Sequence, residues 1–455
     1  MLRRVWYASI AYFAVFFALG LDRYAAHRSA EDLGIFYQTI ASAFGCFCNT
    51  IEGANHLTVH FSPILFLLAP LVLAAHSAWP LIAVSAAANA TVAPALFLIA
   101  RRRTSERNAS FIACVALVYP PLCGVTFADF HENSLVPATI LWLLYALDAR
   151  KYRLAMPCAL VALAIKEDEA LFLLTICAAA FWRARRTGDL AGARWSAAVA
   201  LTSAAVFAGY FGFIRPLLGA HGAWHPAVFY TQTLPSANVG PLRALADRLG
   251  YLVLALAPLA FLPLRSRVMV LALAPFAEVL LSRAPVTYTM GQHYAAVWIP
   301  YVLVAYALAA SELANGRPTI ARRTVGAAYA LCALVFLVAN PLHPRYFLRW
   351  PDARDARLDR FIASLPAGID LGTQEEAYTH MGFFPNATLG MEEYPRYALF
   401  DWEYPDSNWI VRDGPRIRAA VRAGDYRVVR RDGGIALYER IGPKPPEALH
   451  ASPAW

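Results

Sequence analysis

Long runs of apolar residues recur along the first three quarters of the chain, from Val5 to about Asn340. Many of these runs approach the ~20 residues that an α-helix needs to cross ~30 Å of hydrocarbon. After Pro341 the pattern changes to short apolar segments mixed with charge, proline and aromatic residues. This pattern predicts a polytopic α-helical membrane domain over residues 1–341 and a small soluble α/β domain over residues 342–455.

The composition excludes an ordinary soluble protein. Hydrophobic residues make up 59% of the chain and charged residues only 16%, with a mean hydropathy of +0.44. A soluble domain cannot bury that much apolar surface.

Basic residues lie in the short loops between apolar runs, and this placement determines the predicted topology. Such clusters mark the cytoplasmic side of a membrane protein, so the net charge of +9 does not indicate a nucleic-acid partner. Each membrane crossing changes the side on which the following loops lie. All the basic clusters therefore fall on the cytoplasmic side only if one of the two runs 60–75 and 79–100 does not cross the membrane. Run 60–75 contains two prolines and is flanked by histidines, so we predict a juxtamembrane or re-entrant helix on the outer face. The basic clusters are Arg3/Arg4, Arg101–Arg103 with Arg107, Arg150/Lys151/Arg153, Arg183/Arg185/Arg186, Arg265/Arg267 and Arg317/Arg322/Arg323.

The remaining runs predict about eleven transmembrane helices in the inner (plasma) membrane. The N-terminus is then cytoplasmic and the C-terminal domain periplasmic or extracellular. The predicted crossings are 5–21, 79–100, 110–127, 134–149, 152–165, 170–182, 195–214, 249–264, 268–281, 294–313 and 324–341.

Polar loops of a second kind collect on the predicted outer side. They contain acids and histidines rather than arginine clusters: Glu31/Asp32, "DFHEN" (129–133), "KEDE" (166–169) and "TMGQHY" (289–294). This asymmetry predicts that any chemistry takes place at the outer face.

The first outer loop contains an amphipathic segment. From Asp32 to Phe44, apolar residues recur at helical spacing, which predicts a short helix lying on the membrane with Glu31 and Asp32 at its start. The pattern leaves a purely structural role open, in which Asp32 caps this helix. Cys46 and Cys48 follow in the same loop and are predicted to be free thiols, because a Cys-x-Cys bridge is geometrically unfavourable.

"KEDE" is a charged interruption between two short apolar runs. The flanking runs 152–165 and 170–182 give only ~20 Å of helix each, so the cluster is predicted at or below the outer headgroups, in a water-filled recess. Lys166 suits a phosphate, and Glu167 and Asp168 suit a divalent cation or sugar hydroxyls. The alternative is an internal salt-bridge cluster.

"DFHEN" brings Asp129, His131 and Glu132 into one turn between two predicted helices. It is either a metal- or phosphate-side cluster or a simple polar turn. No zinc signature such as His-Glu-x-x-His is present in the sequence. His60, Arg215, His293 and Tyr294 are further outer-face candidates, although such residues also anchor helix ends at the interface.

Five ordered motifs carry a family resemblance. "EDLGIFYQTI", "HFSPILFLLAPL", "DFHEN", "AIKEDEALFLL" and "QHYAAVWIPYVL" resemble the bacterial membrane proteins of domain of unknown function 2079, and the tail segments "FIASLPAGIDLGTQEEAYTHMG" and "YRVVRRDGGIALYER" are also similar. This family lies within the GT-C glycosyltransferase superfamily. The resemblance implies a GT-C-like fold with juxtamembrane helices in the first outer loop and a soluble C-terminal domain.

The resemblance also implies a reaction. The donor would be a sugar carried on polyprenyl phosphate, a membrane lipid that the protein binds from the bilayer. The acceptor would be an envelope glycan, lipid or protein. Asp32 would be the general base, although the neighbouring Glu31 is a second candidate. Lys166 and His131 would stabilise the leaving phosphate. The implied substrate-binding set is Glu31, His60, Asp129, His131, Glu132, Lys166, Glu167, Asp168, Arg215, His293 and Tyr294, and a divalent cation (Mg²⁺ or Mn²⁺) could bind at Glu167, Asp168 and His131.

Two other functions fit the same sequence. A transporter or flippase of lipid-linked saccharides should show repeated halves and polar residues through the membrane depth, whereas here the polar clusters are confined to one face. A catalytically inactive envelope scaffold is the third alternative. The soluble domain has two possible functional roles, acceptor recognition or a lid over the recess. A scaffold that makes no direct contact with substrate is an equally weighted alternative.

Overall fold

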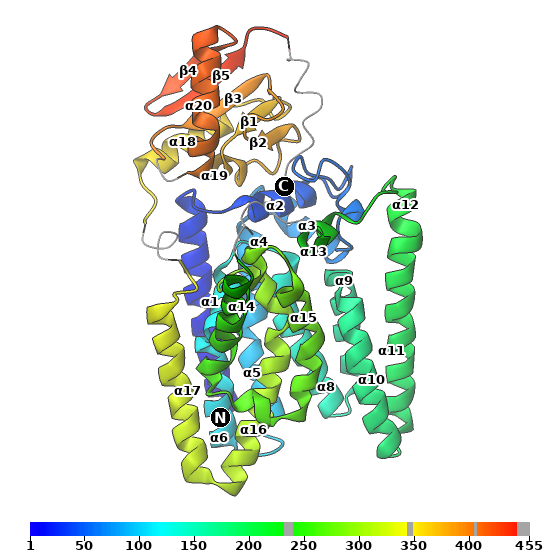
Figure 1. Cartoon of the computed structure of the whole chain (residues 1–455). Coiled ribbons are helices and arrows are strands. Elements are labelled where there is room, and N and C mark those ends of the chain that lie inside the picture. The colour runs from blue at the N-terminus through cyan, green and yellow to red at the C-terminus, as the bar shows by residue number, and fades with distance from the viewer. Residues whose placement is uncertain (232–239, 344–348, 405–406, 444–455) are drawn as a thin grey trace. The chain divides into compact units, whose positions relative to one another are not determined.

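The computed structural model describes residues 1–231, 240–343, 349–404 and 407–443 (Figure 1). The chain forms two compact units that interleave in sequence. The first is Met1–Leu19, Leu57–Leu65 and Ala83–Pro344, and the second is Gly20–His56, Phe66–Ile82 and Arg345–Trp455. Packing therefore places the predicted first outer loop with the C-terminal region. The predicted domain boundary at residue 341 stays a prediction, because it concerns the membrane edge and part of it lies outside the described residues.

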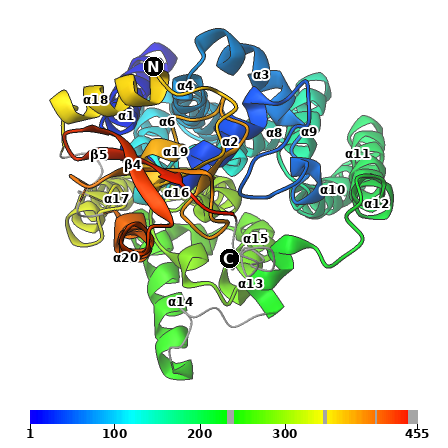
Figure 2. The same ribbon diagram turned by 90° about the horizontal axis from the view of Figure 1, so that it is seen from above.

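The first unit is a bundle of α-helices. Within it, α10 and α11 run side by side as a helical hairpin in both views (Figures 1 and 2). The helices that contribute to it are α1 (Leu2–Ala25), α4 (Trp79–Ala90), α5 (Val92–Ala100), α6 (Glu106–Cys114), α7 (Pro120–Phe127), α8 (Val136–Asp148), α9 (Tyr152–Ile165), α10 (Glu169–Arg186), α11 (Leu190–Gly209), α12 (Arg215–Leu217), α13 (Val228–Thr231), α14 (Pro241–Leu256), α15 (Leu273–Leu281), α16 (Ile299–Gly316) and α17 (Pro318–Val338).

Fewer helices can span a membrane alone than the sequence predicts. By length and composition, four described helices qualify, or five if the bent pair 106–118 and 120–127 counts as one span. The predicted number of about eleven is not confirmed. The helix predicted from run 60–75 exists as α3 (Ile64–Ala75), whose 12 residues span only ~18 Å and cannot cross the membrane alone.

Proline explains where the predicted helices break. The segment 110–127 bends by 49° at Tyr119, ahead of Pro120 and Pro121. The predicted helix 249–264 is wrong beyond Leu256, where α14 ends. Pro258 and Pro263 lack the N–H that a continuing helix needs. Ala260 and Phe261 between them adopt left-handed backbone angles (φ 53° and 54°), and the chain continues in 3-10 turns to Ala272.

The basic loops gather at one end of the first unit. Asp148, at the C-terminus of α8, is the focus of this end. It binds Arg102 at 2.9 Å, Arg103, and Arg183 at 3.8 Å. The connection between α9 and α10 lies at the opposite end of these helices (Figure 1). The assignment of the two ends to the two sides of the membrane stays a prediction.

The second unit contains a five-stranded mixed sheet of order β2-β1-β3-β5-β4. Strand β1 pairs in parallel with β2 and β3, and the other pairs are antiparallel. Helix α18 packs on one face through Leu358 and Phe361, and α20 packs on the other through Ile417. The predicted α/β fold of this region is confirmed, and β4 and β5 form a hairpin that turns after Asp432. The elements are α18 (Ala353–Ala363), β1 (Leu371–Thr373), α19 (Glu375–Tyr378), β2 (Ala387–Leu389), β3 (Tyr397–Asp401), α20 (Asn408–Ala423), β4 (Tyr426–Asp432) and β5 (Ile435–Arg440).

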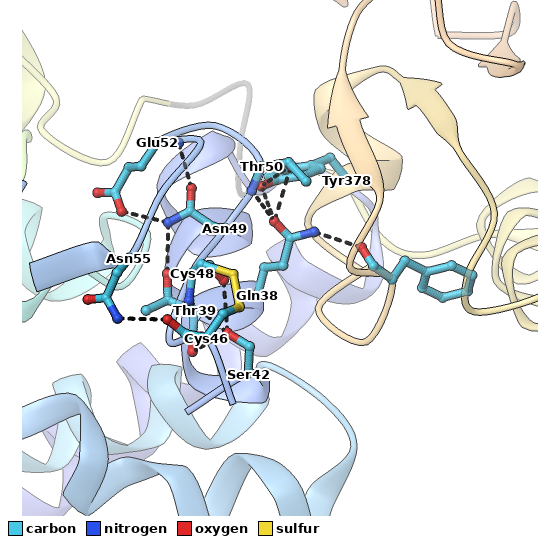
Figure 3. Close-up of a disulfide and its surroundings, with 11 residues drawn as sticks. Gln38, Thr39, Ser42, Cys46, Cys48, Asn49, Thr50, Glu52, Asn55 and Tyr378 are labelled. Atoms are coloured by element: carbon cyan, nitrogen blue, oxygen red, sulfur yellow. Dashed lines mark hydrogen bonds between the residues drawn. A yellow bond between two sulfur atoms is a disulfide. The ribbon is translucent and has the colours of Figure 1, made fainter. Parts of the chain in front are cut away.

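Helix α2 (Glu31–Ala41) docks directly on this C-terminal region. Gly34 allows the close approach, since a side-chain carbon there would collide with the ring of Tyr378. Gln38 is the polar centre of the contact (Figure 3). Its amide nitrogen donates to the carbonyls of Phe384 and Ala387, at 2.7 and 3.3 Å, and its oxygen accepts from the Tyr378 hydroxyl at 3.0 Å.

The loop after α2 is closed by a disulfide between Cys46 and Cys48 (Figure 3). The prediction of free thiols is therefore wrong. The Cα atoms are 5.2 Å apart, inside the ordinary range for a disulfide. The loop reaches this spacing because Phe47 adopts a left-handed backbone angle (φ 48°) that turns the chain between the two cysteines.

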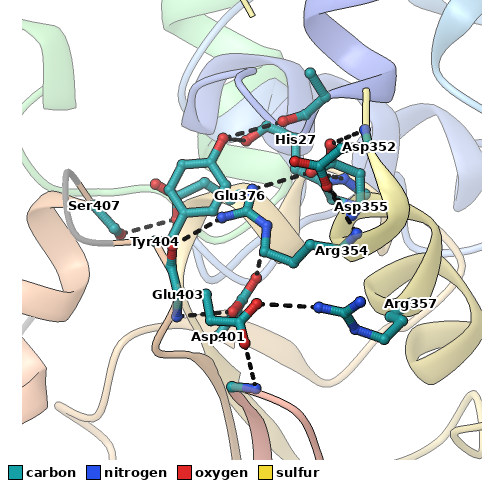
Figure 4. A network of polar contacts seen from close by, with 12 residues as sticks. His27, Asp352, Arg354, Asp355, Arg357, Glu376, Asp401, Glu403, Tyr404 and Ser407 are labelled. Atoms are coloured by element: carbon teal, nitrogen blue, oxygen red, sulfur yellow. Dashed lines mark hydrogen bonds and ion pairs between the residues drawn. The ribbon is translucent and has the colours of Figure 1, made fainter. Parts of the chain in front are cut away.

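A second polar network ties the segment before α2 to the same region (Figure 4). The Tyr404 hydroxyl donates to the His27 carbonyl at 2.7 Å, and Arg349 donates to the Ala26 carbonyl at 2.9 Å. Asp355 accepts both from Arg349 and from the Asp352 backbone, completing a capping box at the start of α18. Residues 26–41 are thus fixed to the C-terminal region along their length.

Candidate functional site

A cavity of about 350 Å³ lies in the first unit, where several predicted site residues meet. Aromatic side chains form one part of its wall and ionisable side chains another, a mixture typical of small-molecule sites. The lining residues are His60, His131, Lys166, Glu167, Asp168, Leu171, Phe207, Phe211, Trp224, Pro226, Phe229, Tyr230, Glu278, Val279, Thr287 and Tyr294.

"KEDE" reaches the cavity because a helix breaks there. Helix α9 ends at Ile165 and Lys166 is fully extended (φ −160°, ψ 157°), before α10 begins at Glu169. The side chains of Lys166, Glu167 and Asp168, between the two helices, all line the cavity and are buried. A pocket is thus present at "KEDE", and its predicted depth below the outer headgroups stays a prediction.

Lys166 is the one lysine among the described residues that line the cavity. Its Nζ lies 3.6 Å from Asp168 Oδ2. Burial alone would lower the pKa of Lys166, but Asp168 and Glu132 hold it above its usual range. The cavity therefore contains a permanent cation.

Glu167 has a different role from its neighbours. One carboxylate oxygen lies 2.9 Å from His60 Nδ1, and the other accepts the backbone N–H of Phe61 at 2.7 Å. Both oxygens are thus engaged with the segment Leu57–Leu65. Glu167 fixes this segment against the α9–α10 connection, and the internal-pairing alternative describes this residue well.

Asp168 has one carboxylate oxygen that can accept a hydrogen bond from a ligand. Its Oδ1 is buried and takes no hydrogen bond from the described part of the chain. Glu278, from α15, lies within hydrogen-bonding reach of the Asp168 carboxyl group. Two such carboxyl groups can hold one proton between them. An open acceptor next to an acid pair is suited to a ligand hydroxyl.

Glu278 is the acidic cavity residue that was not among the predicted site residues. In the sequence it is an isolated acid inside an apolar run, 110 positions after Asp168. The only available signal was the cost of an acid in such a run, which by itself indicates a functional position.

His131 and His293 lie face to face, with ring centroids 3.8 Å apart. The His131 Nδ1 is 3.0 Å from Glu132 Oε2. Burial lowers the pKa of His131 to about 4, so its ring is neutral at pH 7. Tyr294 packs on His293 at 4.0 Å and lines the cavity. The structure thus joins "DFHEN" to "TMGQHY", although only His131 and Tyr294 reach the cavity.

The other predicted residues of this unit are buried without lining the cavity. Arg215 donates to the carbonyls of Thr58 and Ala223, at 3.0 and 3.4 Å, and so supports the same segment as Glu167. Asp129, Glu132 and His293 are buried as well. Their predicted contact with substrate stays a prediction, as does a divalent cation at Glu167, Asp168 and His131.

Glu31 and Asp32 belong to the second unit, in the first turn of α2. The N-cap of this helix is Ala30, so the alternative in which Asp32 caps it is wrong. Burial, together with the neighbouring Asp32, raises the pKa of Glu31 to about 7. The Glu31 backbone N–H donates to Glu375 Oε1 at 2.9 Å. The first turn thus carries two adjacent acids, one of them kept partly protonated.

The fold is similar to that of a protein of known structure. The crystal structure of ArnT from Cupriavidus metallidurans bound to undecaprenyl phosphate matches with a TM-score of 0.59 at 14% identity, covering 96% of this chain and 98% of that one. ArnT in the apo state gives a TM-score of 0.49 at 12% identity, covering 96% and 100%. No curated protein sequence matches the chain. The similarity shows the GT-C fold.

A family model gives the final placement. The model for predicted membrane proteins called DUF2079 matches residues 27–355, which include the cavity residues and α2. The match spans well over half of the chain, and it agrees with the five motifs found in the sequence. The chain therefore belongs to the DUF2079 family of predicted membrane proteins.

Proposed function

We propose that this chain is an integral membrane glycosyltransferase. It moves a sugar from a polyprenyl-phosphate-linked donor to a cell-envelope acceptor on the outer face of the inner membrane. The observation that carries the proposal is the cavity at "KEDE", where a buried cation, an open carboxylate acceptor and an aromatic wall meet. The GT-C fold, shared with an ArnT structure that contains undecaprenyl phosphate, supports a lipid-linked donor.

The cavity residues divide the work of binding the donor. Lys166 supplies positive charge for the phosphate, which must carry additional negative charge as it leaves. Asp168 Oδ1 and Glu278 accept hydrogen bonds from sugar hydroxyls. The aromatic side chains, among them Trp224 and Tyr294, cover the apolar parts of the ligand.

Asp32 acts as the general base. It takes the proton of the acceptor hydroxyl while that oxygen attacks the anomeric carbon and the bond to the phosphate breaks. A general base must lie where it can take the acceptor proton, and the family resemblance of "EDLGIF" favours Asp32 for this role. Glu31, whose pKa burial raises to about 7, is the neighbouring carboxyl group that the Glu31→Gln variant tests.

Transfer by the purified protein in lipid tests the proposal, with a panel of polyprenyl-phosphate sugars as donors. We expect Asp32→Asn to lower the transfer rate by about 10²–10⁴-fold and Glu31→Gln to lower it less than about tenfold. Lys166→Ala should raise the KM for the donor, whereas Lys151→Ala, a matched change at an exposed lysine, should not.

Two results would contradict the proposal. If Asp32→Asn and Lys166→Ala both transfer sugar at the wild-type rate, the proposed mechanism is wrong. Movement of labelled lipid-linked sugar across vesicle membranes without any transfer assigns a flippase instead.

A further inference from the structure

A second group of ligating side chains lies in the second unit, apart from the cavity residues. His27 precedes α2, Asp359 lies on α18 and His380 follows α19. One potential ligand atom from each residue lies within 4.8 Å of the other two. Asp359 Oδ1 is 3.2 Å from His27 Nε2 and 3.7 Å from His380 Nδ1.

These spacings fit a common metal ion. With bonds of about 2.0–2.1 Å to nitrogen and oxygen, two ligands of a tetrahedral site are separated by roughly 3.3 Å. The two measured spacings lie on either side of this value. Two imidazoles and one carboxylate are a donor set that suits Zn²⁺ and similar divalent cations.

The histidines are oriented as metal ligands usually are, each with its second ring nitrogen toward an acceptor. His380 Nε2 lies 3.1 Å from the Tyr24 carbonyl, which directs its N–H there and leaves Nδ1 as a lone pair. His27 Nδ1 lies 3.7 Å from Asp355 Oδ1. Asp355 is itself held by Arg349 and by the capping box of α18. It therefore orients the His27 ring and is not itself a metal ligand.

The simpler alternative is an ion pair without metal. His27 is fully buried between two carboxylates, and its protonation would satisfy both. That explanation leaves out His380, whose ring stacks on His27 with centroids 4.0 Å apart. The Nε2 of His380 is directed to the Tyr24 carbonyl, so its Nδ1 is turned toward Asp359, 3.7 Å away. A metal cation bound by both imidazole rings and by the Asp359 carboxylate accounts for all three side chains.

We propose that His27, Asp359 and His380 bind a divalent cation of the zinc type, with a fourth position open to solvent beside the exposed Asp359. The metal would join the segment before α2 to α18 and to the end of α19. Because α2 carries Asp32, the ion would stabilise the loop with the predicted base without taking part in the transfer itself. This proposal does not rest on the glycosyltransferase activity.

Metal binding by the full-length protein tests it. Any purification tag is first removed, because it could bind metal itself. The protein is then dialysed against chelator in detergent, without reductant so that the Cys46–Cys48 disulfide stays closed. Zn²⁺ or Co²⁺ is then added back. We expect one equivalent per chain after desalting, a visible Co²⁺ absorption band of a four-coordinate site, and a rise in the thermal midpoint on Zn²⁺ addition.

The variants are chosen to keep the fold. Asp359 is 54% exposed, so Asp359→Asn should fold as the wild type does in chelator, yet bind Zn²⁺ at least tenfold more weakly. His380→Gln should weaken binding similarly. His76→Gln, at an exposed histidine of the same unit, and Glu393→Gln, at an exposed acid, should bind as the wild type does.

The proposal is overturned if the wild type retains much less than one equivalent at saturating Zn²⁺. It is also overturned if Asp359→Asn and His380→Gln bind as much metal as His76→Gln. A thermal midpoint that depends on pH but not on Zn²⁺ would assign the group to an ion pair instead.

Discussion

The two groups of histidine and carboxylate side chains described above differ in spacing. In the first unit, His60, His131 and the acids around Lys166 are arranged around a cavity of about 350 Å³. In the second unit, His27, Asp359 and His380 converge to within 4.8 Å. The first arrangement leaves room for an organic ligand, and the second only for an ion. The same residue types thus serve different chemistry according to the space between them.

The largest effect is expected where a charge is left without its partner. Lys166→Met removes the cation from a buried group of acids, which should destabilise the protein by about 3–5 kcal/mol. Lys151→Met, at an exposed lysine, should cost little. The measurement is thermal unfolding in detergent.

A second substitution sharpens this result. Asp168→Asn in the Lys166→Met background removes the nearest negative charge, so it should restore part of the lost stability. If the double variant is less stable than Lys166→Met, the ion pair is not the reason that Lys166 matters.

In the second unit, Gln38 is hydrogen-bonded through both its amide nitrogen and its amide oxygen, so loss of this hydrogen-bonding centre should be the costly change. Gln38→Leu removes the partner of the Phe384 carbonyl and the Tyr378 hydroxyl, and should cost about 3 kcal/mol. Gln292→Leu is a matched change in the first unit. Equal losses would show that α2 is not held mainly through Gln38.

The pH dependence of stability should report on Glu31. Its folded-state pKa of about 7 lies above the ordinary value of 4.5, so the folded protein binds the proton more tightly than the unfolded chain. The stabilisation is therefore present below pH 4.5 and is lost as the pH rises through about 7. The loss is at most about 3 kcal/mol, reduced by partial solvent exposure of the carboxyl group.

Glu31→Gln isolates this contribution. Asp355 and Asp359 raise the pKa of His27 against the opposing effect of burial, so His27 changes stability in the same direction as pH rises. The difference between the wild type and Glu31→Gln removes that shared part. We expect the drop in thermal midpoint between pH 5 and pH 8 to be smaller in the variant, and an unchanged drop would contradict the assignment.

The smallest effect is expected from the disulfide. Reduction of Cys46–Cys48 releases a loop of only three residues, for which chain entropy gives about 1.5 kcal/mol. The thermal midpoint of the Cys46→Ala/Cys48→Ala variant should therefore fall only slightly. A large fall would mean that the bridge supports the Gln38 contacts as well as its own loop.

Local patterns predicted the parts of the fold that depend on local chemistry. The helix at α2 and the break at Lys166 both follow from neighbours in sequence. The helix predicted across 249–264 failed because hydropathy alone does not register the paired prolines Pro258 and Pro263.

Long-range contacts could not be predicted in this way. Glu278 faces Asp168 only because α15 packs near the start of α10, and nothing around residue 278 indicates this. His27 and His380 are 353 positions apart, and neither lies in a ligand motif. The sequence indicated which residues were chemically unusual, while their partners depended on the tertiary fold.

The interleaving of the two units has a consequence for biosynthesis. Residues 26–41 leave the ribosome early, but the groups that bind them, from Arg349 to Tyr404, are made only after nearly all the membrane helices. The first loop therefore cannot make these contacts until Arg349 to Tyr404 have been synthesised. A protein shortened before Arg349 would leave this loop without its binding surface, so the docked loop is a sign that translation has passed Tyr404.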